Sequence, residues 1–449
     1  MNRAGMIAAA WVVVASTAHV QAQEQTSKTG STVFTHSAAP ERSTGSQSGN
    51  ANTALLPGLI REALENNPEI RAAQQERTAA QQRIAPAGAL DDPMLEAGVI
   101  NAPLASSPFN REDMTMKMIG LSQRLPFPGK RGLRKEVASK DAQAIEYGYQ
   151  ETVNRVIHNL KTAYFDLGLA REMFQLTEKN RQTLEYFLRI AEERYQVGQG
   201  SQADVLKAQT QVSRMLDRLL ELEREQPVFE AELMRTLGRG TGTGTLVPAL
   251  LHIQETPLMM EMLQQEAMLQ RPQLLALESL IARNEKSVDL ARRAYYPDLD
   301  VRFSYGQRDS MPDGTRRDDM VSMTVAVNLP VWRGSKIEPR ILESQALRDQ
   351  AASLYQAQRN EVTARLRQQI ALAGQNLKSI KLYQATILPQ ARLTVESALT
   401  AYQVGRVDFL TLLDNQMTVF DFETSRITAI ANYNKALAEI DWLVGKHVH

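Results

Sequence analysis

Three methionines lie at alternating positions of this sequence, and their thioethers are groups that could bind a metal ion. Met114, Met116 and Met118 lie two residues apart, so a β-strand would place them on one face. Thioether sulfur suits soft ions such as Cu(I), which makes a metal relay one interpretation. The other interpretation is an apolar strand surface or simple packing, and we favour it. We therefore predict no metal site in this segment.

Other groups capable of chemistry are sparse. A terminal His-x-His pair, His447 and His449, is only a weak indication of metal binding. The sequence contains no Ser/His/Asp set, no paired-carboxylate cleft and no histidines with metal-ligand spacing. It has no cysteine, so we expect no disulfide, no thiolate zinc site and no lipid anchor on an N-terminal cysteine. The sequence therefore predicts no enzyme activity and no cofactor.

Basic side chains cluster in two regions, each directly after a strand-like segment. Groups of this kind would lie at a membrane surface, near anionic headgroups. Nucleic acid is the rival partner, but 51 Lys and Arg balance 51 Asp and Glu, so no net charge draws the chain to it. The residues are Lys130, Arg131 and Arg134 in the first region and Arg333 and Lys336 in the second.

The elements that position these residues occur twice. Residues 62–70 are echoed by residues 266–274, at an offset of 204 positions. Residues 195–198 match residues 402–405, at an offset of 207 positions, so the second copy contains one small insertion. A repeat of this length is too long for a solenoid unit. We infer two equivalent halves of one pseudo-symmetric body, joined by the Gly/Thr-rich linker at 238–245.

The chain divides into four segments. Residues 1–22, with Arg3 and a short apolar core, have the pattern of a secretory signal peptide, which indicates export from the cytoplasm. Residues 23–52 are rich in Ser, Thr, Gln and Gly, which predicts a disordered leader. The first copy of the repeat occupies residues 53–245, and the second copy occupies residues 246–449.

Each copy contains two strand-like segments. Apolar and polar residues alternate over residues 299–305 and 321–329 of the second copy, and less cleanly over residues 95–99 and 114–125 of the first. Such lengths approach the roughly 9–11 residues of a tilted transmembrane strand. Lys117 falls on the face that the second copy makes apolar, so the lipid-facing side of the first hairpin stays open.

Four strands cannot close a membrane barrel alone. Lipid offers no hydrogen-bond partners, so every backbone N–H and C=O group in the membrane must be paired within the protein. The chain is therefore expected to assemble with copies of itself. Three copies with four strands each would supply twelve strands, which lies within the range of membrane barrels.

Long helices are predicted for most of the remaining chain. Residues 135–196 contain no proline, and their apolar residues recur at heptad-like spacing. Glycines then stop the helix, and residues 203–237 return antiparallel. Residues 341–403 and 409–444 repeat this pattern in the second copy. The heptad-like seam of the first helix consists of Val153, Ile157, Leu160, Tyr164, Leu167 and Phe174.

The duplicated helix–strand–strand–helix order, with a Tyr-x-Val-Gly turn in each copy, resembles the TolC family of outer-membrane channels over residues 55–445. The resemblance implies a mainly α fold with a small transmembrane β part. It implies a trimeric 12-stranded β-barrel in the outer membrane, continued by an α-helical coiled-coil barrel in the periplasm. It also implies docking on a periplasmic adaptor, a membrane fusion protein, and an inner-membrane RND pump, with no nucleic acid involved.

The same resemblance implies a gate at the second helix turn. In the family, Asp residues after this turn form rings that narrow the tunnel mouth. Asp414 matches one such position, Thr411 occupies the other, and Asp408 lies nearby without matching. Three carboxylates around a threefold axis would bind cations. An ordinary solvated helix carboxylate is the alternative for Asp414.

The turns themselves resemble the family's adaptor-docking tips. Gly198 and Gly405 are the turn glycines, and they would also serve as plain helix stops. Tyr195 and Tyr402 lie beside them and are expected either to pack or to hydrogen-bond there.

The cargo is suggested by short segments. Residues 121–131 and Asp92-Pro93 look like the CusC/CzcC-type heavy-metal branch of the family. This implies efflux of copper and silver, or of cobalt, zinc and cadmium. A multidrug or type I secretion channel of the same fold remains an alternative, as does a periplasmic coiled-coil scaffold without a pore.

Overall fold

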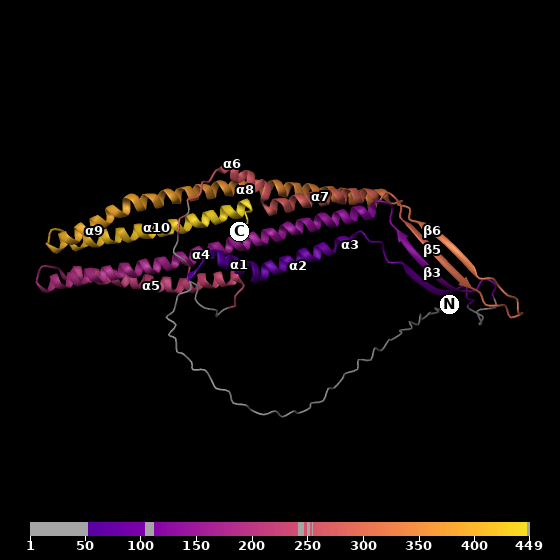
Figure 1. The fold of residues 1–449 in the computed structure, drawn as a ribbon, viewed down its shortest axis with the longest axis horizontal. Helices are drawn as coiled ribbons and strands as arrows, with labels where there is room; N and C mark the ends of the chain where they lie inside the picture. Colours follow the sequence, from indigo (N-terminus) through magenta and orange to yellow (C-terminus); the bar gives the residue numbers. More distant parts are fainter. Residues whose placement is uncertain (1–52, 104–111, 241–246, 249–251, 254, 447–449) are drawn as a thin grey trace, which may run out of the picture. The chain divides into compact units, whose positions relative to one another are not determined.

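The computed structural model describes residues 53–103, 112–240, 247–248, 252–253 and 255–446. These residues belong to one unit, residues 51–449. The predicted signal peptide, the predicted leader and the pair His447 and His449 lie outside the described residues. Helices dominate the unit, and strands form a small part of it, as the sequence predicted (Figure 1).

Two long helical hairpins make up most of the unit. The first hairpin is α4 with α5, and the second is α8 and α9 with α10 (Figure 1). The first long helix begins five residues before its predicted start, because Gly129 adopts φ 91° and so allows a sharp turn directly before Lys130. The bounds are α4 Lys130–Gln196, α5 Gln202–Leu237, α8 Glu338–Leu382, α9 Leu388–Gln403 and α10 Phe409–Val444.

Two π-helical turns interrupt the helices of the second copy. They are η1, Arg333–Ile337, and η2, Tyr383–Ile387, and each lies shortly before a proline, Pro339 or Pro389. Proline lacks an N–H group and crowds the preceding turn, so a wider turn accommodates it. A π-turn also holds more residues than an α-turn. We therefore place part of the insertion that separates the two repeat offsets at these turns.

Five shorter helices pack beside the long ones. They are α1 Leu56–Asn66, α2 Pro68–Gln82, α3 Ile84–Ala87, α6 Met260–Gln270 and α7 Pro272–Arg293. The last helix of each copy ends in the same way. Gly238 and Gly445 end α5 and α10 with φ 72° and 80°, and a Cβ on either would lie 2.7 or 2.9 Å from the carbonyl oxygen of Asn66 or Gln270. Equivalent close approaches therefore occur at equivalent positions of the repeat.

Four strands form an antiparallel sheet in the order β2-β3-β5-β6, so each copy contributes one hairpin. Their bounds are β2 Met94–Ile100, β3 Met116–Leu125, β5 Leu299–Gln307 and β6 Met320–Val327. The hairpins join through β3 and β5, where Leu121 lies opposite Phe303. Strands β2 and β6 therefore lie at the two edges of this sheet. A second, parallel sheet pairs β1 Thr53–Ala54 with β4 Val247–Pro248.

One face of the large sheet is apolar. A single cross-strand row holds Leu95, Leu121, Phe303 and Met323, and 50–72% of each side chain is exposed. The opposite face carries Ser122, Arg302 and Thr324 in the next row.

The registers of β2, β3 and β5 settle the face of the first hairpin. Lys117 shares the apolar face, where it lies opposite Gln307 and forms an ion pair with Asp309 at 3.0 Å. The apolar side of the first hairpin is therefore the side of Leu95 and Leu121.

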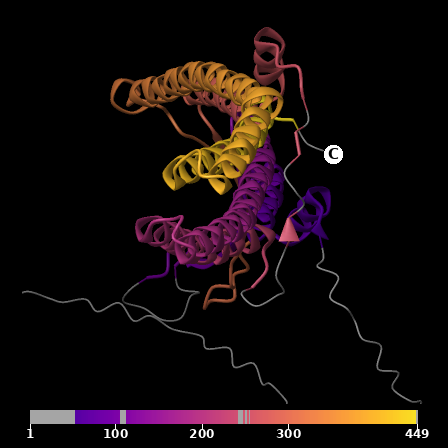
Figure 2. The same cartoon turned by 90° about the vertical axis from the view of Figure 1, so that its left-hand side faces the viewer.

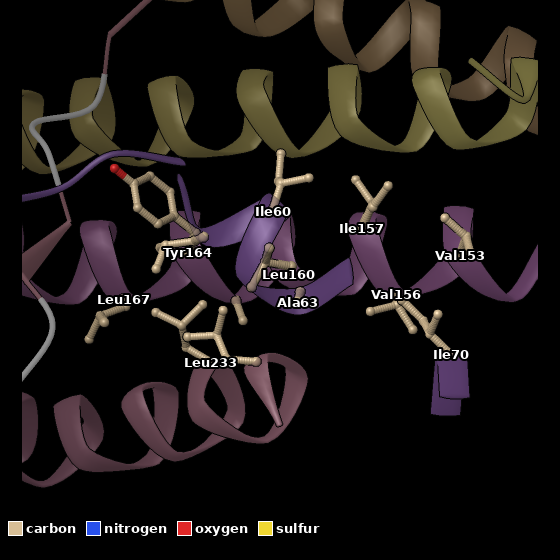
Figure 3. Packing of buried hydrophobic residues seen from close by; sticks show 13 residues of the cluster. Ile60, Ala63, Ile70, Val153, Val156, Ile157, Leu160, Tyr164, Leu167 and Leu233 are labelled. Carbon is tan, nitrogen blue, oxygen red and sulfur yellow. The ribbon is translucent and has the colours of Figure 1, made fainter. Parts of the chain in front are cut away.

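Five of the six residues of the heptad-like seam of α4 are buried, as their spacing predicted, and the sixth, Phe174, is half-buried. Leu160 and Leu167 are fully buried, and they pack with Leu233 of α5 and Ile60 of α1 (Figure 3). Burying such side chains contributes roughly 1.5–3 kcal/mol each. The seam thus holds α4 to the other helices of the first copy.

Candidate functional site at the hairpin turns

The turns of the two helical hairpins have the same backbone geometry. Gly198 and Gly405 adopt φ 74° and 73°. In the first turn the N–H of Gln199 donates to the carbonyl oxygen of Arg194 at 2.8 Å, and in the second turn Arg406 donates to Ala401 at 2.8 Å. These are helix-ending bonds that require a left-handed residue, for which glycine has no steric penalty. Each glycine is also exposed at the surface.

Each turn continues into a capped helix. The Ser201 hydroxyl accepts from the Asp204 N–H, which caps α5. Asp408 takes the same place in the second copy, and its Oδ1 accepts from the Thr411 N–H at 3.0 Å and from the Thr411 hydroxyl. These two bonds from Thr411 lower the pKa of Asp408 below its ordinary value of 3.8. The structure thus brings together two of the three predicted gate residues, as a helix cap.

Asp414, the third predicted gate residue, stands apart. It lies one turn further along α10, on the side away from the buried Leu412 and Leu413, and it is exposed. In the part of the chain that the structure describes, no ion pair involves its carboxylate. An exposed carboxylate without a partner keeps its charge available for ions from solution.

A cation–π contact joins the two turns. The Arg194 guanidinium lies over the Tyr402 ring, with its Cζ 4.6 Å from the ring centroid. Burial raises the pKa of the Tyr402 phenol, and the charge of Asp204 adds to this effect. Tyr402 is 3% exposed and packs against Phe409, whereas Tyr195 is 48% exposed. The two predicted docking tyrosines therefore occupy different environments.

A shared hydrophobic core fixes this arrangement. It includes Phe187 and Leu184 of α4, Ala208 of α5 and Phe409 and Leu412 of α10. Figure 2 views the helices from the end where the turns lie, with the first hairpin in magenta and the second in yellow. Because the core draws on both hairpins, a movement of one turn would disturb the other.

Charged contacts continue between α4 and α10 beyond the turns. Lys161 pairs with Asp441 at 2.8 Å, and Lys435 pairs with Asp166 at 2.9 Å. These pairs join the two copies of the repeat, and their partners lie 280 and 269 residues apart in the sequence, respectively. No local pattern in the sequence indicates them, since each partner looks like an ordinary exposed helix residue.

The predicted membrane-surface cations separate into two groups. Arg131, Arg333 and Lys336 are exposed and Arg134 is half-buried. Lys130 is only 7% exposed, and its Nζ lies 2.7 Å from Asp298 Oδ1 and 2.7 Å from the Tyr296 carbonyl oxygen. The expectation of a surface cation at position 130 was therefore wrong, because this ammonium group is enclosed between α4 and the start of β5.

Asp298 is the centre of that enclosure. It also accepts from the Phe127 N–H at 2.9 Å. Burial alone would raise the pKa of Asp298, but the hydrogen bonds from Lys130 and Phe127 outweigh it and lower the pKa below 3.8. The Asp298 carboxylate is therefore charged at neutral pH, and its bonds to Lys130 and Phe127 hold the strand ends to the helices.

Of the two parts of the favoured interpretation of the methionines, the apolar strand surface is wrong for Met116 and Met118, whereas simple packing is not contradicted. Met116 and Met118 do not lie on the apolar surface of the sheet, because the register places them on the face of Ser122 and Arg302. Met114 precedes β3 and is exposed. Among the described residues no group of three His, Asp or Glu side chains could hold a metal ion. No helix in the described ranges is both long and apolar enough to span a membrane.

Comparison with known proteins gives a consistent result. The family model described as outer membrane efflux protein matches residues 59–239 and 263–446. Outer membrane efflux protein BepC of Brucella suis is 24% identical over 290 residues, which cover 63% of this chain and 62% of BepC. The cobalt-zinc-cadmium resistance protein CzcC of Cupriavidus metallidurans is 25% identical over 186 residues, which cover 41% of this chain and 43% of CzcC. The matched segments thus span less than two thirds of either relative.

A solved structure of CusC shares the fold. Its TM-score is 0.76 at 16% sequence identity, and the superposition covers 90% of this chain and 96% of CusC. At this identity the likeness establishes the arrangement of helices and strands.

Proposed function

This chain belongs to the outer membrane efflux protein family, and we propose that it is the outer-membrane exit channel of a tripartite system that exports metal cations. Membership confirms the resemblance to TolC-type channels, and the mainly α fold with a small β part is that of CusC. As a family member the protein lies in the outer membrane, with its helices in the periplasm.

The open edges of the sheet support a trimer. Strands β2 and β6 each pair on one side only, and lipid does not tolerate an unpaired edge. We infer that β2 of one copy pairs with β6 of the next, so that three copies close a barrel of twelve strands. The apolar row of Leu95, Leu121, Phe303 and Met323 would then face lipid, and the face of Arg302 would line the lumen.

The exposed carboxylate of Asp414 supports a gate for cations. In a trimer three copies of it would lie around the threefold axis, where their combined negative charge attracts cations and repels anions. Asp408 and Thr411 would act on this gate through the helix, because their cap fixes the first turn of α10, one turn before Asp414. We assign them a positioning role.

The exposed parts of the turns support adaptor docking. Gly198, Gly405 and Tyr195 are open to solvent, and a periplasmic adaptor connected to an inner-membrane RND pump is the partner that such a channel needs. Tyr402 is buried under Arg194, so its role is to hold the two hairpins together. The exposed cations Arg131, Arg333 and Lys336 would lie near anionic headgroups of the outer membrane.

The match to CzcC is the observation that supports the proposed class of cargo. That relative is described as a cobalt-zinc-cadmium resistance protein. The segment 121–131, which the sequence linked to the heavy-metal branch, ends β3 and begins α4. Metal cations are accordingly the class of cargo that we propose.

Growth of a deletion strain tests this function. The strain would be compared with and without the plasmid-borne gene on copper, silver, cobalt, zinc, cadmium and nickel salts, beside dyes and antibiotics. Restored tolerance to metals alone is the expected result. Restored tolerance to drugs alone would refute metal cargo and identify a multidrug channel, and no restoration in either panel would refute the efflux role.

A pair of carboxylate variants tests the gate in the same strain. Asp414→Asn removes the proposed ring of charge and is expected to reduce metal tolerance. Asp421→Asn is the matched control, because Asp421 is also exposed on α10, two turns away. Equal tolerance in the two variants would contradict the role of Asp414.

A further inference from the structure

Three thioether side chains gather around one glycine of the sheet. The register places Gly98, Met118, Gly306 and Met320 in one cross-strand row. Gly306 has no side chain, so the space between Met118 and Met320, which flank it, is open to a side chain from a neighbouring position. Met116 completes the group, because a Cβ on Gly306 would lie 2.5 Å from the Met116 sulfur. The space above Gly306 is thus filled by the thioether of Met116.

These methionines lie on the polar face. Their face also carries Ser122 and the ion pair of Arg302 with Glu96, whose atoms lie 3.2 Å apart. Met323, by contrast, lies on the apolar face and is 72% exposed. Burial of apolar surface in lipid therefore does not account for Met116, Met118 and Met320, since in the proposed barrel they would line the aqueous lumen.

The group lies at the end of the sheet that is remote from the helices. Strand β3 begins and β5 ends at this level, whereas the other ends of both strands lead directly into α4 and α7. In a channel that runs from the helices through the sheet, cargo would meet this level last. Met116 and Met118 are half-buried and Met320 is 41% exposed, so an ion could reach the sulfur atoms from the lumen.

We propose that Met116, Met118 and Met320 form a thioether site for a soft monovalent cation, Cu(I) or Ag(I), near the outer end of the lumen. Neutral sulfur ligands favour soft ions over hard ones such as Mg²⁺ or Ca²⁺. Because Met320 is exposed, the site would bind the cation weakly and release it rapidly, which suits transit of the ion rather than its storage. This assignment rests on the proposed export of metals for its biological meaning, and it narrows the cargo to the copper and silver class.

The absence of cysteine makes the site accessible to a direct test. Silver binds thiolates so tightly that they would obscure thioethers, but this chain contains none. Purified protein in chloride-free detergent buffer would be titrated with silver nitrate by calorimetry. X-ray absorption at the silver edge would report whether the bound ion has sulfur neighbours.

The decisive comparison is between leucine variants on the two faces of the sheet. Leucine conserves volume and removes the sulfur. The triple variant Met116→Leu, Met118→Leu and Met320→Leu is expected to bind silver at least about tenfold more weakly, since loss of even an outer partner of a metal ligand costs about 10–100-fold. Met323→Leu is the matched control and should bind as the parent does. Should the triple variant fail to fold, Met320→Leu alone is expected to weaken binding, because this side chain is exposed.

Three results would overturn the site. They are unchanged silver affinity in a folded Met320→Leu or triple variant, an equal loss in Met323→Leu, and a bound silver ion without sulfur neighbours. The outcome is separable from that of the growth assay. Silver binding by the purified protein can succeed where the deletion strain shows no metal phenotype, and it can fail where cobalt or zinc tolerance is restored.

Discussion

The buried ion pair between Lys130 and Asp298 leads to a quantitative prediction. Their side chains are only 9% and 11% exposed, and the two charged atoms lie 2.7 Å apart. Lys130→Met keeps the length and apolar stem of the side chain but removes the closer of the two cations that contact Asp298, since Arg124 stays 3.4 Å away. Removal of one partner of a buried pair costs about 3–5 kcal/mol. We expect about 3 kcal/mol, the lower end of this range, because Asp298 keeps the bond from Phe127 and the longer ion pair with Arg124.

The assay is urea denaturation of the detergent-solubilised protein, followed by circular dichroism. Lys286→Met is the matched control, since Lys286 forms an ion pair of the same length, 2.7 Å with Glu136, at an exposed site, and is expected to change little. The double variant of Lys130→Met with Asp298→Asn should recover a large part of the loss, because no unpaired charge then remains. A single variant as stable as the parent would refute the reasoning.

The same pair predicts a pH dependence. The pKa of Asp298 is lowered in the folded protein, so its contribution is present above the ordinary value of 3.8 and is lost as the pH falls through the folded pKa. Without Lys130 the pKa of Asp298 rises. The difference in stability between parent and Lys130→Met should therefore shrink on acidification below pH 3.8, and a difference that grows instead would contradict the sign.

Three further outcomes are expected at the turns and helix ends. Arg194→Leu removes a cation–π contact worth about 0.5–2 kcal/mol and should raise conductance in planar bilayers. Tyr402→Phe should leave the conductance unchanged, since the phenol oxygen has no hydrogen-bond partner among the described residues. An equal rise in conductance in both variants would contradict the role of the cation–π contact. Asp408→Ala should lower the melting temperature while Asp408→Ser, the residue of the first copy, preserves it. That difference should vanish as the pH falls below 3.8, because the pKa of Asp408 is lowered in the folded state. Gly445→Ala, at φ 80°, should lower the free energy of unfolding in urea by about 1–3 kcal/mol. Gly374→Ala, with open space around it, should instead stabilise α8 by about 1 kcal/mol. Similar changes in the two variants would refute the proposed backbone strain at Gly445.

The regular elements could be predicted because their signals are local. Alternation of apolar and polar residues located the strands, and heptad spacing located the buried seam of α4 around Leu160. The turn glycines Gly198 and Gly405 were found for the same reason, since a left-handed residue at a helix end has few alternatives to glycine. The order of the two hairpins in one sheet followed only from the structure.

Long-range contacts explain what sequence reasoning missed. Lysine at position 130 was expected at the surface, because its partner Asp298 lies 168 residues away and nothing local indicates it. Arg194 and Tyr402 meet only when the two hairpins pack on a common core. Asp408 is different, since Asp-x-x-Thr at a helix start is a local capping signal. A helix cap at Asp408 is therefore readable from the sequence, and the gate role that the resemblance implies for this residue stays a prediction.

The methionines show how a weak pattern fails. In the first hairpin Lys117 and Gln123 interrupt the apolar face, so alternation alone did not assign the faces. The pairing of β3 with β5 assigns them, because Phe303 and Tyr305 fix which side of the shared sheet is apolar. Met116 and Met118 then fall on the other side.

Electron cryomicroscopy of the detergent-purified protein tests the central claim most directly. We predict a threefold ring in which β2 of each copy pairs with β6 of the next, with Leu95 and Phe303 facing detergent and Asp414 facing the axis. A monomer with free sheet edges, or an assembly whose strands do not close around a lumen, would contradict the account of this chain as an exit channel.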